Sequence, residues 1–192
     1  MKKSLGATTI LAPTPAWVIG SYDAAGRANA ATVAWGGICC SKPACVAISL
    51  RAATLTHGNI MARRAFTVNI PSEELVRQTD YFGIASGRDV DKFAATGMTA
   101  TRSELVDAPY IAEFPMVVEC AVLHVVEIGL HTQFIGEIRD IKVEDSLLVE
   151  GGLDVARLRP VVFVPSGHSY HGLTGPLGPA FNVGRCFVAE KP

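Results

Sequence analysis

A candidate phosphate site lies between Ser49 and Asn59, in the run SLRAATLTHGN. A strand-like stretch ends there, Arg51 follows, and the hydroxyls of Thr54 and Thr56 come where a helix is expected to begin. A helix N-terminus attracts anions through its free N–H groups, and a guanidinium strengthens the attraction. Lys92, in a separate polar loop, offers a second positive charge. The alternative is ordinary helix capping by Thr56, with Arg51 in solvent.

A second group of interest lies in the run NAATVAW that starts at Asn29. Side chains alternate between the two faces of a strand, so Asn29, Ala31 and Trp35 share one face. Thr32 lies on the other face unless the strand is bulged. An amide and an indole beside small alanines suit a flat heteroaromatic ring; the alternative is a core tryptophan with a turn asparagine.

Motifs for several other chemistries are missing from the sequence. It contains no G-x-G-x-x-G, no G-x-x-x-x-G-K-[ST] and no H-E-x-x-H. His168 and His171 lie three residues apart, but no nearby carboxylate or thiol completes a metal set, so we expect no metal. The run GHSYHG at 167–172 differs from the nucleophile elbow G-x-S-x-G, because its second glycine comes one residue late.

The elements that must position these residues are mostly strands. Patterns of β-branched and apolar residues predict strands at 16–22, 28–36, 45–50, 66–71, 116–128, 131–143 and 159–165. Helices are predicted from Thr54 or Thr56 to Arg64, from Ser72 to Ile84, and as a short turn at 91–93. Glycine and proline make 166–184 irregular. The fold class is therefore mainly β with inserted helices, as in a small β-barrel, with 159–165 closing the sheet.

Composition places the chain among well-cored globular proteins. It has 192 residues, of which 49% are hydrophobic and 18% charged, with a formal net charge of −1. No linker or repeat divides it, so we expect one domain over 1–192. The balanced charge argues against a nucleic-acid partner, and the apolar composition favours a homo-oligomer.

The cysteines and the apolar stretches indicate the cellular compartment in which the protein is expected. The five cysteines are odd in number and form no C-x-x-C, which indicates reduced, mostly buried thiols, although the role of Cys39 and Cys40 stays open. Prolines interrupt the uncharged stretch 4–22, and charged residues interrupt 116–130, so neither predicts a membrane span or an export signal. We expect a cytoplasmic protein with no membrane partner.

Several motifs, in order, resemble one family. They are SLR at 49–51, Thr56, FTVNIP at 66–71, SGRDVDKF at 86–93 and HTQFIGEI at 131–138. Together they resemble the flavin reductase-like proteins with an FMN-binding split barrel, and within them the flavoredoxin group. The likeness extends from about residue 13 to 184.

This resemblance implies a Greek-key split β-barrel that forms a homodimer and binds one FMN per subunit near the dimer interface. It places Asn29 and Trp35 along the flavin and Thr56 at its phosphate end. His131 would lie close to the cofactor, and an aromatic residue near the last strand would be Phe163, unless Val164 takes that position. The full set of expected cofactor-binding residues is Asn29, Ala31, Thr32, Trp35, Ser49, Leu50, Arg51, Thr54, Thr56, Asn59, Lys92, His131 and Phe163.

The function implied by the resemblance is that of an FMN-containing oxidoreductase whose chemistry belongs to the flavin ring, which explains why no catalytic triad appears. NAD(P)H or a redox protein would supply electrons, so the chain acts either as a flavin reductase or as a protein electron carrier. The alternative outside redox chemistry is a non-catalytic dimeric ligand-binding split-barrel protein. A pyridoxamine-phosphate oxidase-like or haem-binding barrel shares the general shape, but no strong haem ligand set supports it.

Overall fold

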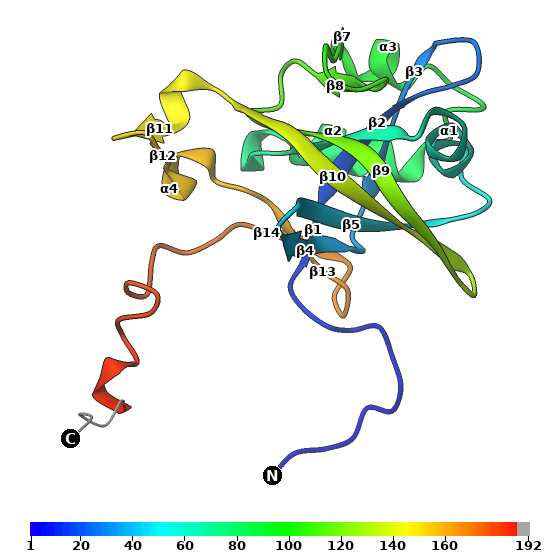
Figure 1. The fold of residues 1–192 in the computed structure, drawn as a ribbon. Coiled ribbons are helices and arrows are strands. Elements are labelled where there is room, and N and C mark those ends of the chain that lie inside the picture. Colours follow the sequence, from blue (N-terminus) through cyan, green and yellow to red (C-terminus); the bar gives the residue numbers. More distant parts are fainter. Residues whose placement is uncertain (188–192) are drawn as a thin grey trace.

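A computed structural model describes residues 1–187 of the chain and shows one large antiparallel sheet with helices beside it (Figure 1). The sheet has seven strands in the order β3-β2-β6-β9-β10-β5-β4. Their bounds are β2 Trp17–Tyr22, β3 Ala28–Val33, β4 Gly36–Ser41, β5 Ala44–Arg51, β6 Ala65–Ile70, β9 Met116–Ile128 and β10 His131–Val143. Strands β3 and β4 are the two edges, so the sheet curls without closing. The mainly β fold with inserted helices is confirmed.

Shorter elements surround this sheet. The helices are α1 Leu55–Arg63, α2 Val76–Ile84, α3 Lys92–Thr96 and α4 Val155–Leu158, with 3-10 turns at Glu73–Leu75, Asp145–Leu147 and Arg185–Phe187. Strand β13 Val162–Val164 pairs with β1 Thr14–Pro15 and β14 Ser169–His171. Two small hairpins join β7 Ala100–Arg102 to β8 Pro109–Ile111, and β11 Leu148–Val149 to β12 Gly152–Leu153. No helix within residues 1–187 has the length and apolar character needed to cross a membrane.

Two apolar clusters hold the fold together. The larger one includes Ile48, Phe66 and Phe134, which have no exposed surface, and it is enclosed by the curl of the sheet. The smaller one contains Val18, Phe82 and further residues of α3 and β8, and it attaches α2 and α3 to the outer face of β2 and β3. Burial of each large apolar side chain stabilises the fold by about 2 kcal/mol. The second cluster fixes the helices against β3, which is where the candidate site forms.

Most of the predicted elements are present. The hairpin from 16–22 to 28–36 and the long hairpin from 116–128 to 131–143 are confirmed as β2–β3 and β9–β10. The strand predicted at 28–36 ends earlier than expected, at Val33, and a separate strand, β4, begins at Gly36. The backbone at Gly36 runs against the ring of Trp17, where a Cβ atom would lie only 2.8 Å from the indole.

Three expectations about structure were wrong. The stretch 159–165 does not close the main sheet: Arg159 ends α4 with a left-handed φ of 48°, and only Val162–Val164 form a strand, in the separate small sheet. The stretch 166–184 is not wholly irregular, since it contains β14. The cysteines are free but not mostly buried, because Cys39 and Cys40 lie on the edge strand β4 and Cys186 lies in the C-terminal arm, all three exposed.

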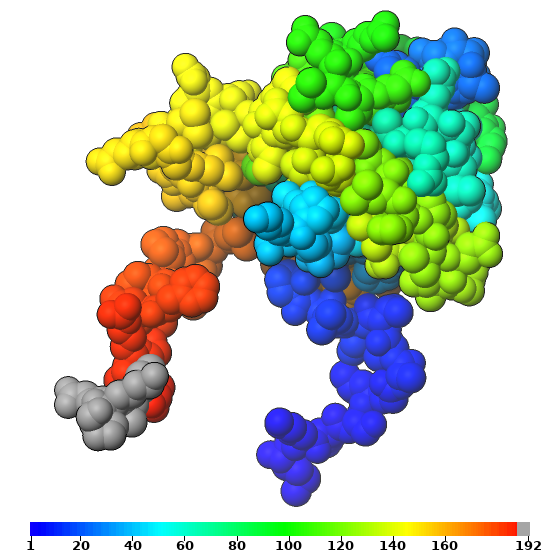
Figure 2. Space-filling view, in the orientation of Figure 1, coloured from blue at the N-terminus to red at the C-terminus, as the bar shows by residue number. Residues whose placement is uncertain are grey.

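Within residues 1–187, the segments nearest the two termini project from the body. In Figure 2 the N-terminal segment, in blue, and the C-terminal segment, in red, leave the same side of the molecule as separate arms. Their apolar residues are exposed, with Leu11 at 80% and Phe181 at 99%. Neither arm reaches the candidate site described below.

Candidate functional site

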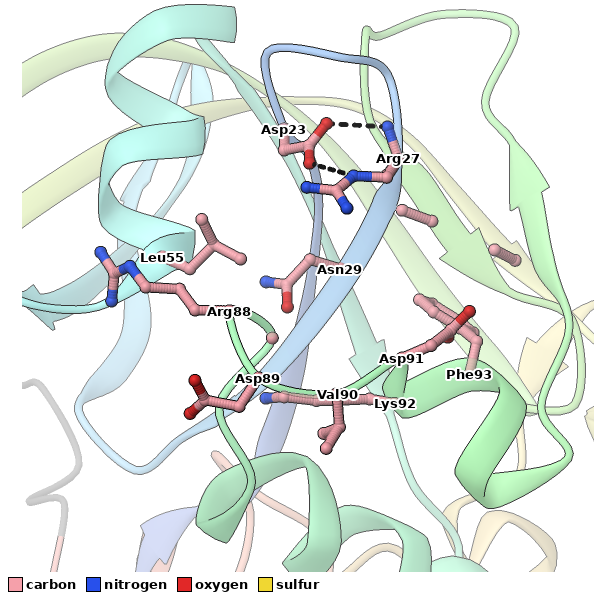
Figure 3. Close-up of a pocket in the computed structure, with 13 residues that line it drawn as sticks. Asp23, Arg27, Asn29, Leu55, Arg88, Asp89, Val90, Asp91, Lys92 and Phe93 are labelled. Atoms are coloured by element: carbon pink, nitrogen blue, oxygen red, sulfur yellow. Dashed lines mark hydrogen bonds and ion pairs between the residues drawn. The ribbon is translucent and has the colours of Figure 1, made fainter.

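The candidate site is a hollow of about 320 Å³ between β3, the start of α1 and the connection from α2 to α3. A hollow of about 420 Å³ adjoins it and shares Asn29, Leu55, Gly87, Arg88 and Lys92 (Figure 3). We call the 320 Å³ hollow the flavin groove, after the FMN site that the resemblance leads us to expect there. Its lining residues are Asn29, Ala31, Thr32, Leu50, Ala53, Thr54, Leu55, Thr56, Phe82, Gly83, Ile84, Ala85, Ser86, Gly87, Arg88 and Lys92.

Asn29 and Thr56 form a polar pair in the groove. The Asn29 side-chain amide donates a hydrogen bond of 2.9 Å to the Thr56 hydroxyl, and both residues are buried, at 6% and 1% exposure. Beneath them, the amide of Asn59 donates to the hydroxyl of Ser21, which is opposite Asn29 on β2. Buried polar groups need such partners, so these two bonds hold α1 against β3 and β2.

Thr54 and Thr56 have different roles at the start of α1. The Thr54 hydroxyl accepts a hydrogen bond from the His57 backbone N–H, which makes Thr54 the N-cap of the helix. Helix capping is therefore confirmed, but the cap is Thr54 and not Thr56, and Arg51 is exposed as that alternative expected. The phosphate site stays a prediction. Thr54 caps the helix, while Thr56 is free of that role and its buried hydroxyl faces Asn29.

Arg88 is a site residue that the sequence analysis missed. Its guanidinium donates a hydrogen bond of 2.8 Å to the Ala53 carbonyl, which holds the arginine beside the N-terminus of α1. In Figure 3 Arg88 and Leu55 lie together on the α1 side of the hollow, with Asn29 projecting toward them from β3. Arg88 lies within the SGRDVDKF motif, but nothing in its local sequence places it near α1, because that contact spans 35 residues.

Lys92 is buried at the first position of α3. Its ammonium group donates two hydrogen bonds of 2.8 Å, to the carbonyls of Ala30 and Phe82, and so joins β3 to α2. Burial lowers the pKa of Lys92 to about 8, because a charged group is less stable away from water. The ammonium still carries its charge at neutral pH. An ammonium has three N–H donors, so one remains for a further acceptor.

Gly87 allows the loop before α3 to lie directly on Asn29. A Cβ atom at this position would come within 2.0 Å of the Asn29 side-chain oxygen and 3.1 Å of Leu55. No side chain larger than hydrogen fits without moving one of these groups. Together with Ala31, Gly83 and Ala85, Gly87 gives the groove walls made of small residues.

The structure brings together seven of the predicted cofactor residues and leaves six outside the groove lining. The residues that line it are Asn29, Ala31, Thr32, Leu50, Thr54, Thr56 and Lys92. Asn59 lies outside this lining, and its amide donates to the Ser21 hydroxyl on β2. Arg51 and His131 are opposite one another at the ends of β5 and β10, and the Ser49 N–H donates to the Trp35 carbonyl. Phe163 lines a separate, neighbouring hollow, to which Val164 does not contribute.

The donor set of the groove fits the phosphate of a flavin mononucleotide. One end offers a helix N-terminus, the threonine hydroxyls and the guanidinium of Arg88, which are groups of the kind that bind anions. The small residues along β3 and the end of α2 leave room for a planar ring. Across residues 1–187 no group of three His, Cys, Asp or Glu side chains is arranged to hold a metal ion.

Comparison with known proteins places the chain in a family. The model of the flavin reductase like domain matches residues 11–167, and the chain belongs to that family. The structure is similar to the flavoredoxin of Desulfovibrio vulgaris (Miyazaki F), with 49% sequence identity, a TM-score of 0.92, and coverage of 96% of this chain and 100% of that one. The recognition of the family and its split-barrel fold is confirmed.

Two further relatives extend the comparison. Flavoredoxin from Methanosarcina acetivorans is 25% identical, with a TM-score of 0.87 and 97% coverage of both chains. The high molecular weight rubredoxin of Moorella thermoacetica is 29% identical over 147 residues, which are 76% of this chain. The chain spans only 58% of the length of that rubredoxin. These relatives support flavin-dependent redox chemistry as the general class of function.

Proposed function

We propose that the chain binds FMN in the flavin groove and acts as a flavin-dependent oxidoreductase. The observation that carries this proposal is the junction of Asn29, Thr56 and Arg88, where an anion site meets a slot walled by small residues. In this arrangement the phosphate lies at the start of α1 and the ring extends along Ala31 and Thr32. Membership of the flavin reductase-like family and 49% identity to a flavoredoxin support the same cofactor.

When bound, the flavin ring supplies the hydride and electron chemistry, and the protein binds, orients and tunes it. Thr56 and Asn29 fix the position of the groove floor relative to the helix N-terminus. Lys92 holds a positive charge beside the groove, where it stabilises negative charge on a neighbouring group. The two carbonyls that accept from Lys92 keep its ammonium in place.

Two roles are consistent with this site. A flavin reductase oxidises NAD(P)H and passes the electrons to free flavin, whereas an electron carrier keeps its FMN and exchanges electrons with other proteins. The 49% identity to flavoredoxin, over the whole of that chain, favours the carrier. The test is steady-state NAD(P)H oxidation with free FMN in excess. A carrier shows almost none, and rapid turnover with saturation by free FMN would assign the reductase role instead.

We also propose that the protein is a homodimer in the cytoplasm. Support for a dimer comes from exposed apolar residues along the outer half of the β9–β10 hairpin, namely Leu123, Val126, Ile128 and Leu130, at 39 to 65% exposure. Apolar patches of this kind favour association. Light scattering after size exclusion tests the dimer, with a monomeric mass as the contradicting result. The free thiols among residues 1–187 suit a reducing compartment, which cell fractionation would test.

A further inference from the structure

A separate hollow of about 230 Å³ borders the flavin groove where the flavin ring is proposed to lie. It shares Thr32, Gly83 and Ile84 with the groove, so any occupant lies next to that end. The Thr32 side chain is fixed between the two hollows, because its hydroxyl donates to the Thr79 carbonyl of α2. The lining residues of the separate hollow are Ala16, Thr32, Val33, Ala34, Asp80, Gly83, Ile84, Phe163 and Tyr170.

The walls of this hollow are apolar and partly aromatic. Phe163 and Tyr170, from β13 and β14, have ring centroids 5.7 Å apart at an angle of 53°. Ile84 is 75% exposed and leaves an apolar edge open to solvent. The volume lies below the roughly 300 Å³ at which pockets for drug-sized ligands begin. The space therefore suits one small planar ring.

Asp80 is the one carboxylate in this lining. It accepts a hydrogen bond of 3.0 Å from the Tyr170 hydroxyl and makes no other side-chain hydrogen bond within residues 1–187. Burial and the neighbouring carboxylate raise the pKa of Tyr170 to about 12, so its hydroxyl stays protonated and continues to donate to Asp80. An ionised carboxylate accepts several hydrogen bonds, so Asp80 keeps the capacity to accept from a ligand.

We infer that this hollow is a small-molecule binding subsite beside the proposed flavin ring, and that it takes a small planar ring compound with an O–H or N–H donor on its edge. Asp80 accepts from that donor, and Tyr170 holds the carboxylate in place while Phe163 contacts the ring. This inference rests on the proposed flavin groove, because the subsite is relevant to redox chemistry only when a flavin is bound in the neighbouring groove.

The test is a calorimetric titration of the FMN-loaded protein with p-cresol and, separately, with 4-methylanisole. The two probes share the ring and the methyl group, and only p-cresol carries an O–H. A hydrogen bond to a charged acceptor predicts about tenfold tighter binding of p-cresol. Asp80→Ala removes this preference. Tyr170→Phe weakens p-cresol binding about threefold and so lowers the preference to about threefold, because the carboxylate is no longer held.

Matched controls separate the subsite from general effects. Tyr81→Phe and Asp145→Asn alter the same residue types outside the hollow and should leave the preference unchanged. Equal binding of the two probes to the wild type, or an unchanged preference in Asp80→Ala, would overturn the subsite.

The FMN content of each variant, read from its visible absorption, keeps the two proposals distinct. Bound FMN without a p-cresol preference rejects the subsite alone. If no FMN binds, the proposed function fails. The same titration of the flavin-free protein then shows whether p-cresol binds in the hollow, because the hollow is lined by protein residues alone.

Discussion

The Asn29 amide and the Thr56 hydroxyl, 27 residues apart in the chain, meet in a buried hydrogen bond of 2.9 Å. This bond connects an edge strand of the sheet to the first turn of α1. An anion site at a helix N-terminus is useful only if the helix is held at a fixed position relative to the ring-binding strand. The Asn29–Thr56 bond provides that connection, and under the proposed FMN site the hydroxyl of Thr56 has both a structural and a binding role.

Removing the Thr56 hydroxyl should weaken both the fold and FMN binding. Thr56→Val keeps the shape but leaves the buried Asn29 amide without this acceptor, which costs about 1 to 3 kcal/mol of unfolding free energy. Urea denaturation with and without FMN measures the loss, and fluorescence titration measures FMN affinity. Thr56→Ser retains a hydroxyl and should behave nearly as the wild type. Wild-type stability in Thr56→Val would contradict the importance of this bond.

Gly87 should tolerate no side chain. In Gly87→Ala the new methyl group would lie 2.0 Å from the Asn29 oxygen, so the loop or the asparagine must move and FMN affinity should fall about tenfold or more. Gly58 is the matched control, because nothing lies within 4 Å of a Cβ atom on this exposed helical residue. Gly58→Ala should stabilise the protein by up to about 1 kcal/mol through helix propensity. Equal FMN affinity in both variants would show that the loop does not depend on Gly87.

Lys92 should give stability a specific pH dependence. Its pKa is lowered to about 8 in the folded state, from an ordinary value of 10.5, so between these values the unfolded chain binds more protons. Stability from this residue is therefore present above pH 10.5 and is lost as the pH falls through 8, with a slope of at most about 1.4 kcal/mol per pH unit.

The measurement is urea denaturation of the wild type and Lys92→Met across pH 7 to 10.5. The variant lacks this slope, and at neutral pH it loses about 2 kcal/mol because two buried carbonyls lose their donor. Parallel pH profiles for the two proteins would contradict the lowered pKa.

The cysteines should divide into two reactivity classes. Cys39, Cys40 and Cys186 are exposed, whereas Cys45 and Cys120 are buried, and burial raises the pKa of both buried thiols. Because the thiolate is the reactive form, the buried pair should react with an aromatic disulfide reagent only after unfolding. Three thiols per chain should react quickly in the native protein. Rapid reaction of all five would contradict the burial of Cys45 and Cys120.

Local patterns in the sequence predicted most of the strands, because β-branched runs bounded by glycine and proline define hairpins such as β9–β10. They failed at 159–165, where Arg159 ends α4 with a left-handed backbone and β13 pairs with β1, about 150 positions away in the chain. The exposure of Cys39 and Cys40 was missed for a related reason. An apolar strand at the edge of a sheet has the same local pattern as one at its centre.

The candidate site was predictable only in part. Hydroxyls after a strand end indicated the helix N-terminus, and Thr54 and Thr56 lie there. Arg88 and Gly87 carry no local signal, since each acts through a contact with a distant residue. The pairing of Tyr170 with Asp80 spans 90 residues and joins β14 to α2, so no spacing rule could have found it.

The most direct test of the central claim is the visible absorption spectrum of the purified protein, with release and quantification of its chromophore. We predict two flavin bands and about one FMN per chain, after supplementation with FMN if the purified protein lacks it. A colourless protein that takes up no added FMN would contradict the assignment of the groove and leave a ligand-binding barrel without redox function.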